Sequence, residues 1–264
     1  MRKTEIFSKP RSIATTRVGS HGYLTQWDGL QLLASLKDGV ADLVFLDPPF
    51  NLGKSYSHAE PEGLNERNYL RYMTRVLEES TRVVQRGGAV FMYHLPGVAI
   101  RLVDVLAREL DFRHWIAIAM KNGFARGQHL YPAHYALLYF TKGEPAHFER
   151  PKTSPLRCRH CKELVRDYGG YRAIIEKKGV NLSDVWDDLS PVRHPSRKHR
   201  ASNELPLELT DRVVAIAGFE AGLLVDPFAG TGTALVSAQH AKMRFVGNDV
   251  DPDSIRICID RLRR

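Results

Sequence analysis

Apolar runs of strand length alternate with amphipathic runs of helix length in the first third of this 264-residue chain. The strand-like runs are VADLVFLD, AVFMYHL and RHWIAIAM. The helix-like runs are WDGLQLLASLKDG, which we expect to end at Gly39, NERNYLRYMTRVLEESTRVVQRGG, which we expect to end at its Gly-Gly pair, and VAIRLVDVLAREL. Strands that alternate with helices form crossover units, so the pattern predicts an α/β fold with a doubly wound, mostly parallel sheet.

The alternation weakens in the middle of the chain and returns near its end. ALLYFTKG reads as one more strand, whereas residues 145–205 are charged, weakly periodic, and contain a short candidate helix near 171–177. We therefore expect residues 145–205 to lie outside the sheet. The later elements are the helix LELTDRVVAIAG, the strand GLLVDPF, the turn and helix AGTGTALVSAQHA, the strand RFVGND and the helix DSIRICIDRLRR. The sequence predicts a single domain over 1–264 with an inserted lobe over about 121–200.

Bulk composition excludes several classes of protein. With 43% hydrophobic and 26% charged residues the chain has a globular composition. No apolar run approaches the roughly 20 residues that span a bilayer, and the polar, basic start lacks the apolar core of a secretory signal. Three cysteines are too few for a disulfide scaffold. We therefore expect a cytoplasmic protein without a membrane segment.

Positive charge is concentrated in one segment. The formal net charge is +8, and residues 150–200 contain thirteen basic and six acidic residues. A solvated surface lobe would explain this excess, but a surface that binds nucleic acid is the stronger interpretation.

A glycine-rich turn near the C-terminus is typical of a nucleoside site. In LLVDPFAGTGTALVSAQHAKMRFVGNDVDP, a strand ends at Asp226, and Gly230 and Gly232 allow a tight turn whose amides face a ligand. Asp249, at the end of the next strand, can accept the hydroxyls of a ribose. Because the chain has neither G-x-G-x-x-G nor G-K-S/T, an adenosine ligand without phosphates fits better than a dinucleotide. A purely structural turn is the alternative.

The sequence Asp47-Pro48-Pro49-Phe50 follows a strand of the first third. Prolines end strands, so a strand-ending turn is one explanation. The other is functional, since the carboxyl ends of parallel strands form the ligand-binding edge of an open α/β sheet.

Together, DPPF and DPFAGTG…VGNDVDP resemble the amino-DNA methyltransferases that use S-adenosyl-L-methionine. The family's catalytic motif is Asp, Asn or Ser followed by Pro-Pro and an aromatic residue, and its cofactor loop has the form D-P-F-x-G-x-G. Here the catalytic motif comes first and the cofactor loop last, with a basic segment between them, which resembles the β class. The likeness runs from about residue 28 to the C-terminus. It implies a Rossmann-like methyltransferase fold with permuted motif order.

The resemblance also assigns roles to particular residues. Asp47 and the Pro48 carbonyl would accept hydrogen bonds from an exocyclic base amine, and Phe50 would stack on a base flipped out of the duplex. Cofactor contacts are implied for Asp28, Asp226, Pro227, Phe228, Ala229, Gly230, Thr231, Gly232, Thr233 and Asp249. An N-cap of the following helix is the other reading of Asp28. The chain has NELP where the family pattern has TQKP, so contacts made by that stretch do not transfer.

The implied function is site-specific transfer of a methyl group to adenine N6 in double-stranded DNA. Asp at the first motif position is associated with adenine and Ser with cytosine. The alternatives are cytosine-N4 methylation, or a DNA-binding protein of this fold that has lost catalysis. The family includes homodimers and enzymes paired with a restriction endonuclease, and the sequence leaves both open. The inserted lobe over about 121–200 is expected to recognise the target sequence. DNA contacts are expected from Lys54 and from the basic segment, namely Arg157, Arg159, Lys162, Arg166 and Arg172.

Cys158 and Cys161 form a C-x-x-C pair within that segment. A structural zinc ion takes four ligands, and His160, His194 and His199 are the other candidates. The long gap to His194 favours two ordinary thiols, and a redox pair is a third reading. Cys258 lies among isoleucines of the last predicted helix and is expected in the core.

Overall fold

The computed structural model describes residues 1–10, 12–51, 64–119, 128, 130, 132–158, 160–166, 168–189 and 204–263. The elements of the first half are α1 (Lys3–Ile6), β1 (Thr16–Val18), β2 (Gly22–Thr25), α2 (Gly29–Ser35), β3 (Ala41–Leu46), α3 (Glu66–Val83), β4 (Val84–His94), α4 (Pro96–Ala107) and β5 (Asp111–Ala119). They are followed by β6 (His134–Thr141), β7 (Lys152–Thr153), η1 (Tyr168–Gly170), α5 (Arg172–Lys178), β8 (Val180–Asn181), β9 (Val185–Trp186), α6 (Leu207–Ala217), β10 (Leu223–Asp226), α7 (Thr233–His240), β11 (Arg244–Asn248) and α8 (Pro252–Leu262).

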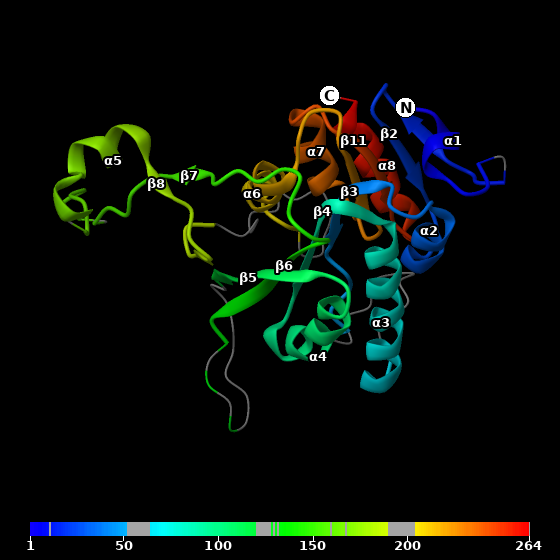
Figure 1. The fold of residues 1–264 in the computed structure, drawn as a ribbon, viewed down its shortest axis with the longest axis horizontal. Coiled ribbons are helices and arrows are strands. Elements are labelled where there is room, and N and C mark those ends of the chain that lie inside the picture. The colour runs from blue at the N-terminus through cyan, green and yellow to red at the C-terminus, as the bar shows by residue number, and fades with distance from the viewer. Residues whose placement is uncertain are drawn as a thin grey trace.

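A nine-stranded sheet runs through the molecule in the order β1-β2-β11-β10-β3-β4-β6-β5-β9 (Figure 1). The strands from β2 to β4 pair in parallel, and the antiparallel pairs are β1–β2, β4–β6 and β5–β6. The strand β3, from the first part of the chain, lies beside β10, from near its end. The sheet therefore brings the two ends of the sequence together.

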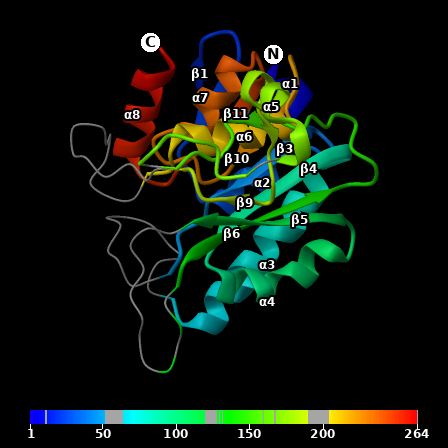
Figure 2. The ribbon, with the colours of Figure 1, turned by 90° about the vertical axis from the view of Figure 1, so that its left-hand side faces the viewer.

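Helices cover both faces of this sheet. Figure 2 shows α3 and α4 on one side and α6 and α7 on the other. One core cluster packs residues of α2, α3 and α4 against the sheet, and a second packs residues of α6, α7 and α8 against the opposite face. The prediction of a doubly wound, mostly parallel α/β fold is confirmed. No helix within the described ranges is both long and apolar enough to cross a bilayer.

Two predicted helix ends were wrong. α3 stops at Val83, and the Gly87-Gly88 pair lies inside β4 instead of ending the helix. Gly87 has a φ of 79° and donates its amide to the Lys142 carbonyl, and a side chain on Gly88 would come within 2.9 Å of the Asp42 carbonyl oxygen. These glycines serve strand packing. α2 likewise ends at Ser35, before Gly39.

The middle segment is only partly outside the sheet. Residues 145–205 were expected outside it, but β9 pairs in parallel with β5 and buries Trp186. The short helix expected near residue 171 is confirmed as α5. Residues 150–183, here called the basic lobe, carry β7, β8 and α5, which project from the sheet in Figure 1. The target-recognition role assigned to residues 121–200 stays a prediction.

Candidate active site and cofactor cleft

The Asp47–Phe50 tetrad and the glycine-rich turn emerge side by side. Leu43 and Val44 of β3 pair in parallel with Leu224 and Val225 of β10. All residues of β3 and β10 are buried, and Asp47 directly follows β3 while Asp226 ends β10. Both acids therefore reach the same carboxyl edge of the sheet, which is where open α/β sheets bind ligands.

Glycine is required at two positions of the turn after β10. Gly230 and Gly232 have φ angles of 52° and 84°, which favour glycine over other residues. A side chain on Gly232 would come within 2.4 Å of the Cys258 sulfur, so α8 packs directly behind the turn. Cys258 is fully buried there, as expected from sequence.

Two polar residues at the end of β11 hold this turn in place. The Asp249 carboxylate accepts the Gly230 amide through Oδ2 (2.8 Å) and the Asp251 amide through Oδ1 (2.9 Å). Asn248 is fully buried, accepts from Thr25 and Trp27, and donates to the Trp27 and Pro227 carbonyls. Sequence reasoning missed Asn248, because its partners lie far away along the chain.

Three acidic residues, Asp47, Asp226 and Asp249, lie close enough to interact electrostatically. Asp226 is 2% exposed and accepts the Phe228 amide at 3.0 Å. Burial raises its pKa well above the ordinary carboxyl range, and the neighbouring charges of Asp47 and Asp249 raise it further. The negative charges of Asp47 and Asp249 near this carboxyl favour a cationic ligand.

This raised pKa predicts how stability depends on pH. The folded state holds the Asp226 proton more tightly than the unfolded chain, so this stabilisation is complete at low pH and is lost as pH rises through the folded-state pKa. Asp226→Asn keeps an acceptor for the Phe228 amide but does not titrate. We expect the melting temperature of the variant, relative to wild type, to increase with pH in ligand-free samples between about pH 5 and 8.5. A constant difference across that range contradicts this prediction.

Asp28 acts as the N-cap of α2. Its Oδ1 accepts the Leu30 and Gln31 amides, and its Oδ2 accepts the Tyr72 hydroxyl at 2.8 Å. A side chain on Gly29 would lie 2.8 Å from the Phe228 ring, so this cap abuts the glycine-rich turn. The structure thus supports the capping interpretation, and a contact with the cofactor stays a prediction.

Phe50 sits among other aromatic rings. Its ring centroid is 4.7 Å from that of His94 and 5.9 Å from those of both Tyr93 and Tyr135. Burial, followed by the charge of Asp47, raises the pKa of both tyrosines. Sequence reasoning missed all three neighbours. The sequence offered one signal for this cluster, a histidine at the end of the apolar run AVFMYH.

The NELP stretch contributes a buried ion pair. The side chains of Glu204 and Arg261 are 5% and 13% exposed and approach to 3.0 Å. Arg261 also donates to the Thr231 carbonyl at 2.9 Å. The NELP stretch lacks the basic residue of the TQKP pattern, but Arg261 of α8 brings a basic group to it. Arg261 fixes the turn between its two glycines.

Breaking this pair should strongly destabilise the fold. Arg261→Leu removes the cation that pairs with the buried Glu204 carboxylate, and we expect a loss of about 3–5 kcal/mol in the free energy of unfolding. The double variant Glu204→Leu/Arg261→Leu should recover much of that loss. Urea denaturation of the two single variants and the double variant measures the coupling, and additive losses would argue against it.

In the basic lobe, two of the predicted DNA contacts are already paired within the protein. Arg157 bonds Glu176 at 3.2 Å and the Lys162 carbonyl, and Arg172 forms ion pairs with Glu163 and Glu176. Lys162 and Arg166 are exposed. Lys54 and Arg159 lie outside the described residues. The lobe's DNA contacts stay predictions.

The C-x-x-C pair lies at the surface of the lobe. Backbone amides of Cys161 and His160 lower the pKa of the Cys158 thiol. Within the described residues, no group of three or more His, Cys, Asp or Glu side chains is placed to hold a metal ion. His194 and His199 lie outside those residues, so zinc binding stays a prediction.

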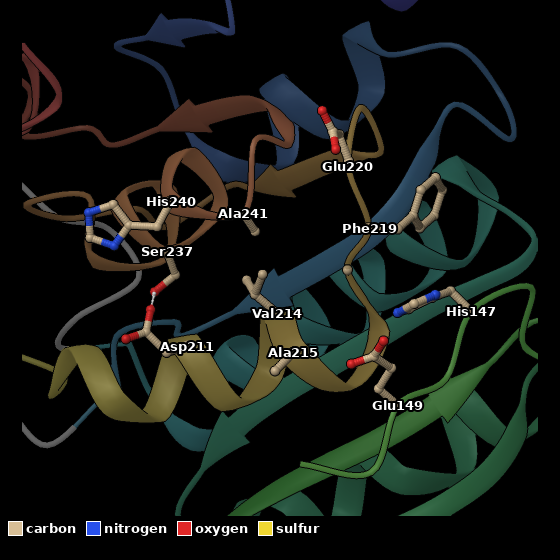
Figure 3. A pocket seen from close by; sticks show the side chains of 11 residues that line it. His147, Glu149, Asp211, Val214, Ala215, Phe219, Glu220, Ser237, His240 and Ala241 are labelled. Carbon is tan, nitrogen blue, oxygen red and sulfur yellow. Dashed lines mark hydrogen bonds between the residues drawn. The ribbon is translucent and has the colours of Figure 1, made fainter. Parts of the chain in front are cut away.

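A cavity of about 400 Å³ lies elsewhere on the molecule, between α6 and α7 (Figure 3). On one side the His147 and Phe219 rings lie with their centroids 5.8 Å apart, tilted by 47°, and on the other Ser237 donates to Asp211 at 2.6 Å. None of the predicted catalytic or cofactor residues lines it. It is therefore separate from the carboxyl-edge site.

Comparisons with known proteins show the family of this chain. A family model described as DNA methylase (N6_N4_Mtase) matches residues 41–260. The type II methyltransferase M.BamHI of Bacillus amyloliquefaciens is 39% identical to this chain. The match covers 86% of this chain but only 54% of M.BamHI. The solved PvuII DNA methyltransferase, described as cytosine-N4-specific, shares the fold with a TM-score of 0.67 at 14% identity, covering 92% of this chain and 87% of that one.

A second solved structure, the M1.HpyAVI–SAM complex, has a TM-score of 0.63 at 14% identity, covering 92% of this chain and all of that one. These structural likenesses concern the fold, whereas the family model covers both motifs found at the sheet edge. The chain therefore belongs to the N6/N4 DNA methylase family, and its motif order places it in the β class of amino-DNA methyltransferases, whose cofactor is S-adenosyl-L-methionine.

Proposed function

We propose that this chain is a site-specific DNA methyltransferase that methylates N6 of an adenine flipped out of double-stranded DNA. The observation that carries the proposal is the meeting of the Asp47–Phe50 tetrad and the glycine-rich turn at one sheet edge, on the neighbouring parallel strands β3 and β10. The chain spans about half of the length of M.BamHI, so the activity and partners of the whole protein are proposed as well.

The cofactor would be held by the turn after β10 and by Asp249. S-adenosylmethionine supplies a methyl group activated by a positively charged sulfonium. Asp249, which accepts the Gly230 amide of the turn, would also accept ribose hydroxyls, and the negative charges of Asp47 and Asp249 near Asp226 would favour a cation. The close packing of Gly232 on α8 holds the turn rigidly in place.

The tetrad would prepare the base amine. An exocyclic amine is a poor nucleophile, because its lone pair is delocalised into the ring. Asp47 and the Pro48 carbonyl can accept its two N–H groups and draw the nitrogen toward tetrahedral geometry. Asp47 also stabilises the positive charge that develops on the nitrogen, which then loses a proton. Stacking on Phe50 offsets part of the few kcal/mol that flipping the base costs.

Cytosine-N4 methylation is the second candidate, because that amine presents the same two N–H groups to the same acceptors. The test is to incubate the protein with DNA and S-adenosylmethionine, digest the DNA, and identify nucleosides by mass. We expect N6-methyldeoxyadenosine. N4-methyldeoxycytidine would support the second candidate. Cofactor and DNA binding without a methylated product would support a catalytically silent DNA-binding protein.

The basic lobe is our candidate for target recognition. Exposed Lys162 and Arg166 can contact phosphates, and exposed Tyr171 and Ile174 offer apolar contacts beside them. A homodimer and a companion restriction endonuclease are compatible with this role. Long-read sequencing of DNA from cells that express the protein would identify the modified base and its sequence context together.

A further inference from the structure

A chain of three hydrogen bonds through the buried side chains of His94 and Tyr69 ends on the Asp47–Phe50 tetrad. The Leu95 amide donates to His94 Nδ1 at 2.7 Å, the Tyr69 hydroxyl lies 2.6 Å from His94 Nε2, and that hydroxyl donates to the Pro49 carbonyl at 2.7 Å. His94 is 0% exposed and Tyr69 is 2% exposed. The chain connects α3 and the end of β4 to the turn after β3.

The direction of each bond follows from the first one. Because Nδ1 accepts from Leu95, the ring proton of neutral His94 lies on Nε2. Nε2 then donates to the Tyr69 oxygen, which leaves the hydroxyl proton for Pro49. Burial lowers the pKa of His94 to about 4, so this tautomer persists at neutral pH. His94 is therefore neutral and donates through Nε2 to the Tyr69 oxygen.

His94 also supports the next residue of the tetrad. Its ring centroid is 4.7 Å from the Phe50 ring, with an angle of 32° between the planes. The His94 imidazole thus supports two residues of the tetrad. It is linked to the Pro49 carbonyl through the Tyr69 hydroxyl, and its ring packs against the Phe50 ring. These two adjacent residues directly follow Asp47 and Pro48, which supply the amine acceptors in the proposed function.

We propose that His94 and Tyr69 are positioning residues for methyl transfer, which orient the tetrad so that its acceptors and the Phe50 ring meet the flipped base together. This inference rests on the proposed function. A displacement of about 1 Å at a reacting group can lower a rate about a hundredfold. Loss of the hydrogen-bond chain should therefore slow the chemical step without weakening cofactor binding, since these bonds act on the turn after β3, whereas the glycine-rich turn follows β10.

The experiment measures single-turnover methyl transfer at saturating DNA and cofactor, and cofactor affinity by calorimetry. Tyr69→Phe removes one hydroxyl, and we expect the rate to fall about 10- to 100-fold while the cofactor dissociation constant stays within about twofold. His94→Phe keeps a ring against Phe50 but removes both nitrogens, and the double variant should be no slower than the slower single variant. His94→Gln, which can still donate to Tyr69, should recover part of the rate.

A matched control separates positioning from stability. Thr81→Val removes another buried hydroxyl of α3, which donates to the Leu77 carbonyl away from the tetrad. We expect a lower melting temperature and an unchanged rate. Wild-type rates in folded Tyr69→Phe would overturn the inference. A wild-type protein that binds cofactor but methylates no DNA would instead overturn the proposed function. If His94→Phe fails to fold, Tyr69→Phe and His94→Gln decide the question.

Discussion

Asp47→Ala is expected to abolish detectable methyl transfer to DNA, a loss of at least about a thousandfold, while cofactor binding largely survives. The variant leaves the base amine without its charged acceptor, so the lone pair stays in the ring and the developing positive charge is not stabilised. Asp47 follows β3, whereas the glycine-rich turn follows β10, so removing one side chain need not disturb the turn. Transfer of labelled methyl groups and calorimetry of the cofactor measure the two effects.

A graded series tests the same mechanism. Asp47→Asn keeps an oxygen acceptor but loses the charge, so its rate should lie between those of wild type and Asp47→Ala. Asp38→Ala removes a carboxylate whose side chain is 82% exposed and pairs with Arg82, and it should leave transfer unchanged. Turnover close to wild type in Asp47→Ala would refute the proposed chemistry.

The two motifs could be located in the sequence because their signals are local. Each motif occupies a few consecutive residues at the end of an apolar run, and the strands that precede them are continuous and buried. The parallel pairing of β3 and β10 brings both motifs to the carboxyl edge, where open α/β sheets bind ligands. The same locality explains why Asp28 had two readings, since an acid before a helix is also a good cap.

What sequence reasoning missed depends on contacts between distant residues. Asn248 bonds Thr25, and Arg261 bonds Glu204, and neither pairing leaves a local pattern. β9 is only two residues long, too short to show periodicity, yet it joins the sheet through β5. The Gly87-Gly88 pair failed as a helix stop because glycine serves tight strand packing as readily as helix termination.

Asp249→Ala should weaken cofactor binding by about 10- to 100-fold, which is the value of one or two charge-assisted hydrogen bonds. DNA affinity should change much less. The variant removes the proposed ribose acceptor and also the carboxylate that holds the Gly230 amide at 2.8 Å. Calorimetry with S-adenosylmethionine and a DNA-binding titration without it measure the two affinities separately.

Two variants distinguish ribose binding from support of the turn. Asp249→Asn keeps an oxygen that can accept the Gly230 amide, so any remaining loss of affinity reports the missing charge at the ribose. Asp251→Ala removes the N-cap of α8, whose carboxylate accepts the Asp253 and Ser254 amides. That change should lower stability by about 1 kcal/mol and leave cofactor affinity unchanged. Unchanged affinity in Asp249→Ala would exclude the ribose role. Equal losses in Asp249→Ala and Asp251→Ala would show that the chain around β11 acts only by holding the turn.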